Sequence, residues 1–204
     1  MTIWLVRHGE TELNAARVLQ PADTPLSAHG ERQAQALAER LADEPLAGIL
    51  SSDLPRALQT AQRVAERTGL AVQTSTLLHE RHFGDWRGQP YDSLQTDPLG
   101  MSEAPPGGES AAVFGQRCRQ AFDQLLQARR ALGGPLLVVT HGLVIRELLA
   151  ALPSQAHAET TWPRLGNTSL TVIDAEPPHT MRRLNCTLHL QGRLQEAPDS
   201  LSGG

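Results

Sequence analysis

The sequence contains no lysine, because all 18 of its basic residues are arginine. This absence excludes the phosphate-binding lysine of P-loop nucleotide hydrolases, the ATP-binding lysine of protein kinases and any Schiff base formed on a lysine amine. A genome rich in G and C would explain the preference for arginine, and the exclusions hold whatever its cause.

Cysteine is scarce, and the sequence has no net positive charge and no long apolar run. Cys118 and Cys186 are too few for a disulfide framework, and neither belongs to a CxxC pair, so we expect two free thiols. No stretch approaches the roughly 18 apolar residues of a membrane span, and no signal-peptide pattern opens the chain. We therefore expect a soluble, cytoplasmic protein with no membrane partner. The formal net charge of -4 argues against a nucleic-acid partner as well.

The chain does contain an alternation of short apolar runs and amphipathic segments. Apolar runs typical of strands occur at residues 3–6, 47–50 and 136–139, and we expect further strands at 70–74, 169–173 and 181–190. Helical periodicity covers residues 27–43, 55–69, 109–132 and 143–152. This alternation predicts an α/β fold, a three-layer sandwich in which helices flank a mostly parallel central sheet. We expect one domain over residues 1–192, with an irregular lid at 85–108 and a flexible tail at 193–204.

Two of the apolar runs end in the same pair of residues, His8-Gly9 after Arg7 and His141-Gly142 after Thr140. Ligands of open parallel sheets bind beyond the carboxyl ends of the strands. If the two strands are neighbours, both imidazoles therefore lie in one crevice.

Arginines and a helix start lie near the same sheet edge. Arg7 precedes His8, and Arg56 lies in the first turn of the helix that follows the second apolar run. Their guanidinium groups match phosphate oxygens in a bidentate way, and backbone donors near Leu143 would favour an anion at this edge. For Arg56, these residues leave an anion-binding role and a surface salt bridge equally open.

Seven motifs follow one another along the chain: LVRHGET at 5–11, LSAHGERQA at 26–34, SSDLPRALQTA at 51–61, ERHFGDWRG at 80–88, PGGES at 106–110, VTHG at 139–142 and NTS at 167–169. Together they resemble the histidine phosphatase superfamily, also called the phosphoglycerate-mutase-like family. The resemblance covers nearly the whole chain. It implies the phosphoglycerate-mutase-like fold and an enzyme that hydrolyses phosphoric monoesters.

The resemblance also implies roles for particular residues. His8 is similar to the nucleophile that becomes a phosphohistidine, and Glu80 to the proton donor. Arg7, Arg56 and His141 are similar to the residues that hold the transferred phosphoryl group. Further substrate contacts are implied for Asn14, Gln20, Gly142, Thr168 and Ser169, although Pro21 replaces the glycine that usually follows Gln20. Because two arginines and one imidazolium would offset much of the phosphoryl charge, we expect no metal and no cofactor.

The lid decides between two activities within the family. A phosphatase releases its product and admits water, whereas a mutase keeps a phosphorylated product bound. The lid carries four acids against one arginine, Arg87, a balance poorly suited to a second phosphate; the acids are Asp85, Asp92, Asp97 and Glu103. We therefore favour a metal-independent phosphatase of small phosphorylated metabolites. A cofactor-dependent phosphoglycerate mutase is the first alternative, and a non-catalytic member that binds a phosphorylated ligand is the second.

The remaining histidines suggest no further site. His79 and His82 are three residues apart, which could suit a metal on a helix, but they lie in a predicted loop. We expect no metal there. His29 and His157 are expected on the surface, and His189 is expected in a structural role within the last strand.

Overall fold

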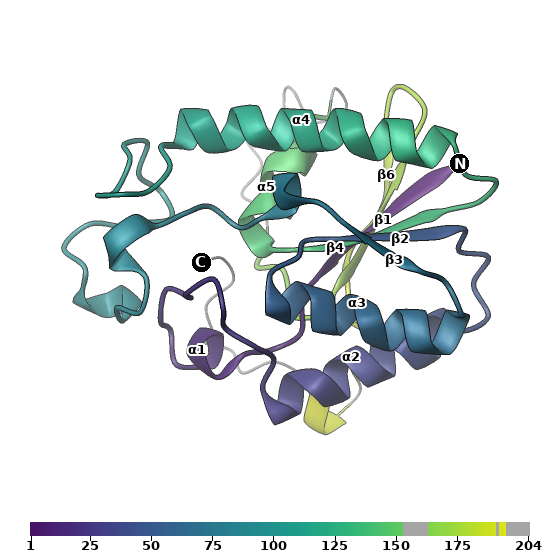
Figure 1. Ribbon diagram of the computed structural model, residues 1–204, viewed down its shortest axis with the longest axis horizontal. Helices are drawn as coiled ribbons and strands as arrows, with labels where there is room; N and C mark the ends of the chain where they lie inside the picture. The colour runs from purple at the N-terminus through teal and green to yellow at the C-terminus, as the bar shows by residue number, and fades with distance from the viewer. Residues whose placement is uncertain (153–162, 191, 195–204) are drawn as a thin grey trace.

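The computed structural model describes residues 1–152, 163–190 and 192–194, and these residues include a six-stranded sheet. In spatial order the strands are β3 (Val72–Thr74), β2 (Gly48–Ser51), β4 (Leu136–Thr140), β1 (Thr2–Arg7), β5 (Leu170–Asp174) and β6 (Met181–Cys186). The first four are parallel, whereas β5 runs antiparallel to β1 and β6 antiparallel to β5. The expected α/β fold with a mostly parallel sheet is confirmed (Figure 1).

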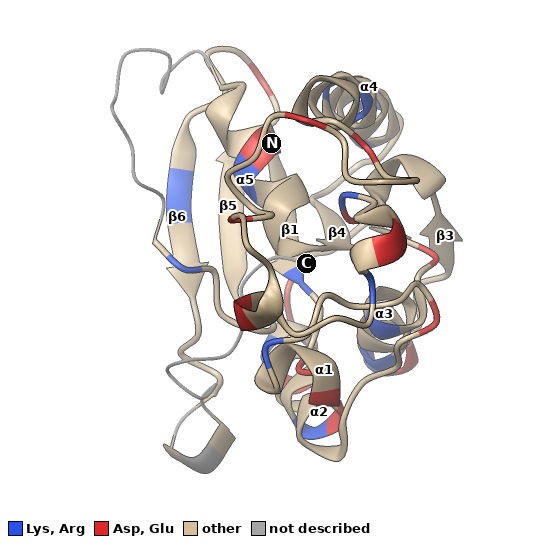
Figure 2. Cartoon of the chain, turned by 90° about the vertical axis from the view of Figure 1, so that its left-hand side faces the viewer, with Lys and Arg blue, Asp and Glu red and all other residues tan. Residues whose placement is uncertain are grey.

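Helices cover both faces of the sheet (Figure 2). On one face lie α2 (Ala28–Leu41) and α3 (Pro55–Thr68), and on the other lie α4 (Ala111–Arg130) and α5 (Gly142–Ala150). In β1, Leu5 packs in the core cluster of α4 and α5, whereas Val6 packs in the cluster of α2 and α3. Because successive strand residues point to opposite faces, central strands buried on both sides are apolar on both faces, as β4 is from Leu136 to Val139.

Local signals in the sequence predicted the helix ends. The Ser27 side chain caps α2 by accepting a hydrogen bond from the Gly30 backbone, and Ser110 caps α4 in the same way. Helix α3 begins at Pro55 and ends before Gly69, whose φ of 73° favours glycine. Each of these helices lies within a few residues of its predicted range.

Two sequence predictions about local structure were wrong. The last strand ends at Cys186 and does not reach Leu190; its regular extended geometry is already lost at its penultimate residue, Asn185, which has a φ of 51°. His189 therefore lies beyond the strand. The short helix α1 (Glu12–Ala15) was missed, because four residues carry no periodicity.

The lid at 85–108 contains only short helical turns. The turn η2 (Gly84–Trp86) begins one residue before the lid, and η3 (Tyr91–Ser93) lies within it. The turn η1 (Thr76–Leu78) precedes both. A last turn, η5, covers Gly192–Leu194. His157 and most of the expected tail, residues 195–204, lie outside the described residues. Within the ranges described, no helix is both long and apolar enough to cross a bilayer.

Candidate active site

The candidate site lies where β1 and β4 end side by side. The two strands pair in parallel with Arg7 opposite Thr140, and the backbone N–H of His8 donates to the Thr140 carbonyl at 2.9 Å. The rings of His8 and His141 are consequently neighbours, with centroids 5.2 Å apart and planes inclined at 59°. Both side chains are buried. The expectation that the two histidines share one crevice is confirmed.

The position of the proton on the His8 ring follows from the hydrogen bond that its Nδ1 makes. Nδ1 lies 2.7 Å from the Gly9 carbonyl oxygen. Since a carbonyl only accepts, Nδ1 must carry a proton, and in the neutral ring the lone pair is then on Nε2. Burial, with the positive charges of Arg56 and Arg7, holds the His8 pKa well below its usual value. His8 is therefore a neutral ring with an unprotonated Nε2 at neutral pH.

His141 has a different set of contacts. Nε2 shares a hydrogen bond of 2.9 Å with the Ser52 hydroxyl, while Nδ1 has no partner within the described part of the chain. Burial, with the nearby charge of Arg56, holds the His141 pKa well below its usual value. The neutral ring is therefore favoured in this structure, and the imidazolium that we expect beside a bound phosphoryl group stays a prediction.

Arg7 and Arg56 bring two positive charges into the same interior. Each is 1% exposed, and Nη1 of Arg7 donates to the Leu165 carbonyl at 2.6 Å. Nη1 of Arg56 donates to Pro21 O at 3.3 Å, and its Nε has no partner among the described residues. Burial lowers the Arg56 pKa to about 10, against the opposing effect of Glu80. A surface role for Arg56 is excluded, and an anion beside it would offset this cost of burial.

The backbone donor of Leu143 at the start of α5, where we expected an anionic ligand, binds the side chain of Glu80 instead. Its Oε2 accepts from the Leu143 N–H at 3.1 Å, and its Oε1 accepts from the Arg81 N–H at 3.0 Å. The carboxylate is 3% exposed. The positive end of the α5 dipole therefore stabilises an acid of the protein itself.

Asn14 and Gln20 lie together in the buried loop that follows His8. Oδ1 of Asn14 accepts from the Thr11 N–H at 2.6 Å, and the Thr11 hydroxyl contacts Gln20 Oε1 at 2.7 Å. Nδ2 of Asn14 contacts Asn167 Oδ1 at 3.4 Å, and Nδ2 of Asn167 donates to the His8 carbonyl at 3.0 Å. Asn14 is thus joined to the backbone of His8 through one side chain.

Thr168 and Ser169 close the site from the loop before β5. Thr168 has a φ of 51°, and its N–H donates to the Arg7 carbonyl at 3.0 Å. Its hydroxyl pairs with Nε2 of His189 at 3.0 Å, and Nδ1 of His189 faces Arg40 at 3.1 Å. His189 therefore has the structural role that we expected, because it supports this loop, but it lies in a turn after β6 and not in the strand. The Ser169 hydroxyl is buried without a partner in the described ranges, and Gly142 is the first residue of α5.

Three supporting residues had no predicted role. Ser52 bonds His141, and its only signal was its place in the SSDLPR motif. Thr60 Oγ1 accepts from Gly9 N–H at 3.0 Å and donates to the Arg56 carbonyl at 2.7 Å, an i, i+4 contact that helical spacing could have suggested. Arg117 donates to the carbonyls of Leu77, His79 and Glu80. Nothing in its sequence neighbourhood predicts those contacts.

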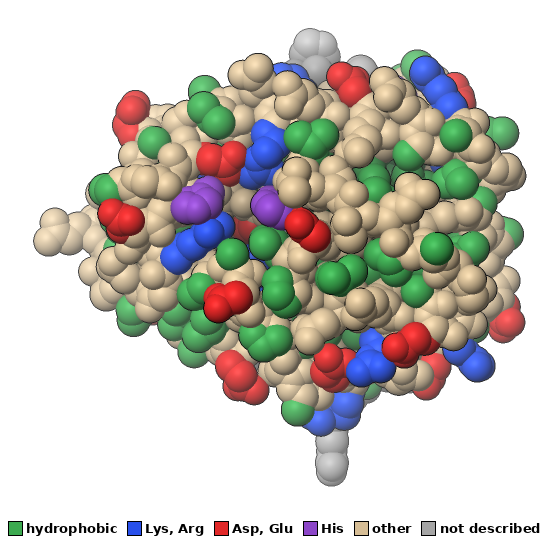
Figure 3. Space-filling model, viewed as in Figure 1, with side chains coloured by type: hydrophobic (Ala, Val, Ile, Leu, Met, Phe, Trp, Pro, Cys, Tyr) green, Lys and Arg blue, Asp and Glu red, His purple; other side chains and the backbone are tan. Residues whose placement is uncertain are grey.

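A cavity of about 380 Å³ adjoins Glu80 under the lid. Its charged and titratable lining comprises His79, Glu80, His82, Arg87, Glu109 and Arg117. Figure 3 shows histidine and arginine side chains gathered at this end of the molecule.

The four acids of the lid do not line the cavity. Asp92 pairs with Arg17 at 3.0 Å, and Asp97 accepts hydrogen bonds from Tyr91 and from the Leu99 N–H. The formal charge of the lid therefore does not describe the charge of the cavity, because Asp92 and Asp97 bind partners outside it.

The histidines near the cavity are engaged with their own neighbours. Nε2 of His79 pairs with Asp53, and Nδ1 of His82 accepts from the Gly84 N–H at 2.9 Å. The described residues include no group of three or more His, Cys, Asp or Glu side chains placed to hold a metal ion. Cys118 and Cys186 are both free thiols.

Comparisons with known proteins agree with this geometry. The family model of the histidine phosphatase superfamily, branch 1, matches residues 3–187. A probable phosphoglycerate mutase GpmB of Yersinia enterocolitica is 38% identical over 185 residues, 85% of each chain. The glucosyl-3-phosphoglycerate phosphatase of Mycobacterium tuberculosis is 38% identical over 177 residues, 79% of this chain and 78% of that protein.

Solved structures show the same relationship. A mycobacterial glucosyl-3-phosphoglycerate phosphatase superposes with a TM-score of 0.75 at 34% identity, covering 91% of this chain and 98% of that one. YhfR of Bacillus stearothermophilus superposes with a TM-score of 0.79 at 30% identity, covering 93% and 99%.

Proposed function

The chain belongs to the histidine phosphatase superfamily, and on that basis we propose that it hydrolyses small phosphate monoesters through a phosphohistidine on His8. The observation that carries the proposal is the contact between Nδ1 of His8 and the Gly9 carbonyl. This contact fixes the ring and leaves the Nε2 lone pair available for attack on phosphorus.

In the first step, Nε2 of His8 attacks the phosphorus and the ester P–O bond breaks. Glu80, which acts in this step in its protonated form, gives its proton to the departing alkoxide, which leaves as an alcohol. In the second step, water attacks the phosphohistidine and Glu80 takes a proton from that water. The N–P bond breaks, inorganic phosphate forms, and His8 returns to its neutral state.

The charge of the phosphoryl group is offset by groups already in place. Phosphoryl transfer depends mainly on positioning and on stabilising the equatorial oxygens. Arg7 and Arg56 are buried beside His8, and their charges lower its pKa. A phosphoryl dianion bound there would draw a proton onto His141, since it reverses the local charge that now disfavours the imidazolium. This accounts for catalysis without a metal ion.

Asn14, Gln20, Gly142, Thr168 and Ser169 are proposed to complete the substrate contacts. Asn14 and Thr168 are held by hydrogen bonds near the backbone of His8, and the Ser169 hydroxyl is buried without a partner in the part of the chain described. Buried hydroxyls and amides at this position can donate to phosphoryl oxygens.

A phosphoglycerate mutase is the second candidate, because one relative at 38% identity carries that name. The two activities separate in one assay. We expect the purified protein to release phosphate from p-nitrophenyl phosphate in EDTA. Interconversion of 2- and 3-phosphoglycerate faster than phosphate release, given a bisphosphate primer, would establish the mutase. Binding of phosphate esters without either reaction would establish a non-catalytic member.

A further inference from the structure

The cavity beside Glu80 contains two arginines in very different situations. Arg117 uses all of its donors: Nε and Nη2 bind the Glu109 carboxylate at 2.9 and 2.7 Å, and its remaining contacts are with backbone carbonyls. The Glu109 carboxylate also neutralises its charge. Arg117 is therefore part of the wall and has nothing left to offer a ligand.

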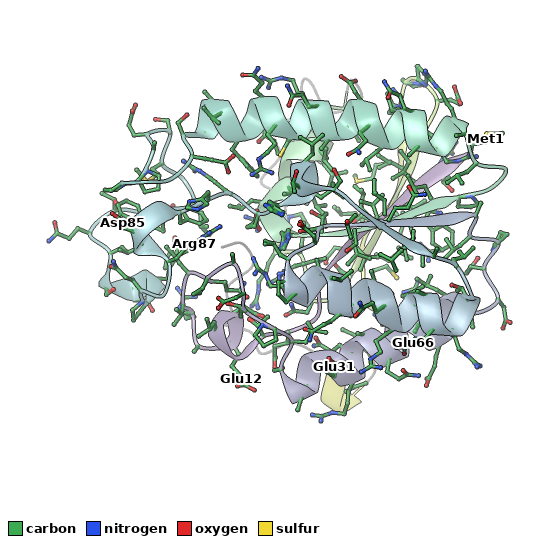
Figure 4. All side chains as sticks on the ribbon, in the orientation of Figure 1. Met1, Glu12, Glu31, Glu66, Asp85 and Arg87 are labelled. Atoms are coloured by element: carbon green, nitrogen blue, oxygen red, sulfur yellow. The ribbon has the colours of Figure 1, made fainter. Side chains whose placement is uncertain are left out.

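The side chain of Arg87, in contrast, has no hydrogen bond or ion pair within the residues described, and its Nε is buried. It follows η2 on the lid, and Figure 4 shows it closer to the body of the protein than the exposed Asp85. Its charge contributes to lowering the pKa of Arg56, so it is within electrostatic reach of the phosphoryl pocket. A half-buried guanidinium without a partner is costly, and an anion in the cavity would remove that cost.

The two histidines of the lining add no fixed positive charge. His79 is paired with Asp53. Burial, with the charge of Arg87 beside it, lowers the pKa of His82 below its usual value. Among the described side chains that line the cavity, Arg87 is consequently the one arginine whose guanidinium has no hydrogen bond or ion pair, although the negative charges of Glu109 and Glu80 act on it.

We infer that the cavity receives the leaving group of the substrate and that Arg87 binds a carboxylate on it. The substrate class is then a small phosphate monoester whose alcohol carries a carboxylate. This inference rests on the proposed function. A cavity of about 380 Å³ can hold an alcohol of a few carbons or one that carries a small further substituent. One planar guanidinium matches one carboxylate in charge and in geometry, whereas a second phosphate would need more donors.

The test compares two esters that differ at one position. Glycerol 3-phosphate and 3-phosphoglycerate have the same carbon skeleton, but the second carries a carboxylate where the first carries a hydroxymethyl group. We expect the wild type to have the higher kcat/KM for 3-phosphoglycerate. In Arg87→Gln, the ratio of the two kcat/KM values should fall about 10- to 100-fold, the effect of losing one charge-assisted hydrogen-bond pair. Arg87→Lys, which keeps the charge but not the fork, should lose less.

Arg130→Gln is the matched control. Arg130 is exposed at the end of α4 that lies away from the lid (Figure 1), so its loss should leave both kcat/KM values unchanged. If Arg87→Gln does not fold, as judged by circular dichroism, the ratio in Arg87→Lys decides the question.

Three results would overturn the inference. In the first, the ratio changes by less than about twofold in the Arg87 variants, a difference too small for a lost ionic contact. In the second, both esters lose activity equally, which would place Arg87 on the transferred phosphoryl group. In the third, propane-1,3-diol bisphosphate is hydrolysed in preference to 3-phosphoglycerate, which would assign the cavity to a second phosphate. If the wild type hydrolyses no ester at all, the proposed function itself fails.

Discussion

The pocket at the ends of β1 and β4 and the cavity under the lid are held in different ways. In the pocket, His8 and His141 follow neighbouring parallel strands and their rings are fixed by hydrogen bonds to Gly9 and Ser52. The cavity is bounded by an irregular segment whose backbone relies on positive-φ glycines such as Gly84 and Gly107. The chemistry is therefore built on the rigid sheet, while selectivity is assigned to the segment that can change without disturbing it.

The largest effect should come from removing the nucleophile on the sheet side. His8→Ala is expected to lower kcat for p-nitrophenyl phosphate by at least about 10⁴-fold, because the phosphohistidine cannot form. The assay is run in EDTA, and circular dichroism checks the fold. Turnover like that of the wild type would contradict the role of His8.

The next largest effect should come from a buried arginine of the same pocket. Arg56→Gln is expected to lower kcat about 10²- to 10³-fold, because it removes a charge that faces the developing negative charge of the phosphoryl group. Arg63→Gln is its control, since Arg63 lies in the same helix but forms partly exposed ion pairs with Glu31 and Glu66. Equal losses in the two variants would mean that the charge of Arg56 has no specific role.

A change in the lid should act on binding more than on chemistry. At Gly84 a Cβ atom would lie 1.9 Å from the Pro106 carbonyl, and the residue has a φ of 55°. Gly84→Ala should therefore displace the segment at 105–108, lower the free energy of unfolding by about 1–3 kcal/mol and raise KM. Gly88→Ala has a strained φ but meets nothing within 4 Å, so it should destabilise less. Urea unfolding measures the stability of both variants, and steady-state kinetics measures their kcat and KM. A fall in kcat with KM unchanged would contradict the assignment of substrate binding to the lid and of chemistry to the sheet.

The smallest effect concerns the pH dependence of stability. Burial and the charge of Arg40, opposed by the bond to Thr168, lower the His189 pKa to about 4 in the folded protein. Since the unfolded chain binds this proton first, stability is complete above about pH 6.5 and falls as pH drops toward 4, by about 1.4 kcal/mol per pH unit. Buried His8 and His141 act in the same direction. His189→Gln should flatten the slope of unfolding free energy between pH 6 and 5, and an unchanged slope would exclude His189 as a contributor.

The sequence predicted the parts of the site that depend on strand ends. His8, His141, Arg7 and Arg56 lie next to apolar runs and helix starts, so a parallel sheet brings them together whatever the loops do. The family resemblance then supplied Glu80, whose position in a loop no periodicity could predict.

The parts that sequence could not predict depend on side-chain direction across long separations. The formal charge of the lid was misleading because Asp92 turns toward Arg17 and leaves Arg87 facing the cavity. The charge state of His141 cannot be predicted from the sequence, because it depends on burial and on the nearby charge of Arg56. The end of β6 was misplaced because a positive φ at Asn185 leaves no signal in an otherwise strand-like run.

The central claim is that phosphate passes through His8, and the stereochemistry at phosphorus tests it most directly. A substrate ester with a phosphate made chiral by oxygen isotopes and sulfur is hydrolysed, and the configuration of the product is determined by phosphorus NMR. Two successive in-line displacements, first by Nε2 of His8 and then by water, predict overall retention. Inversion would show a single direct attack by water and would contradict the account.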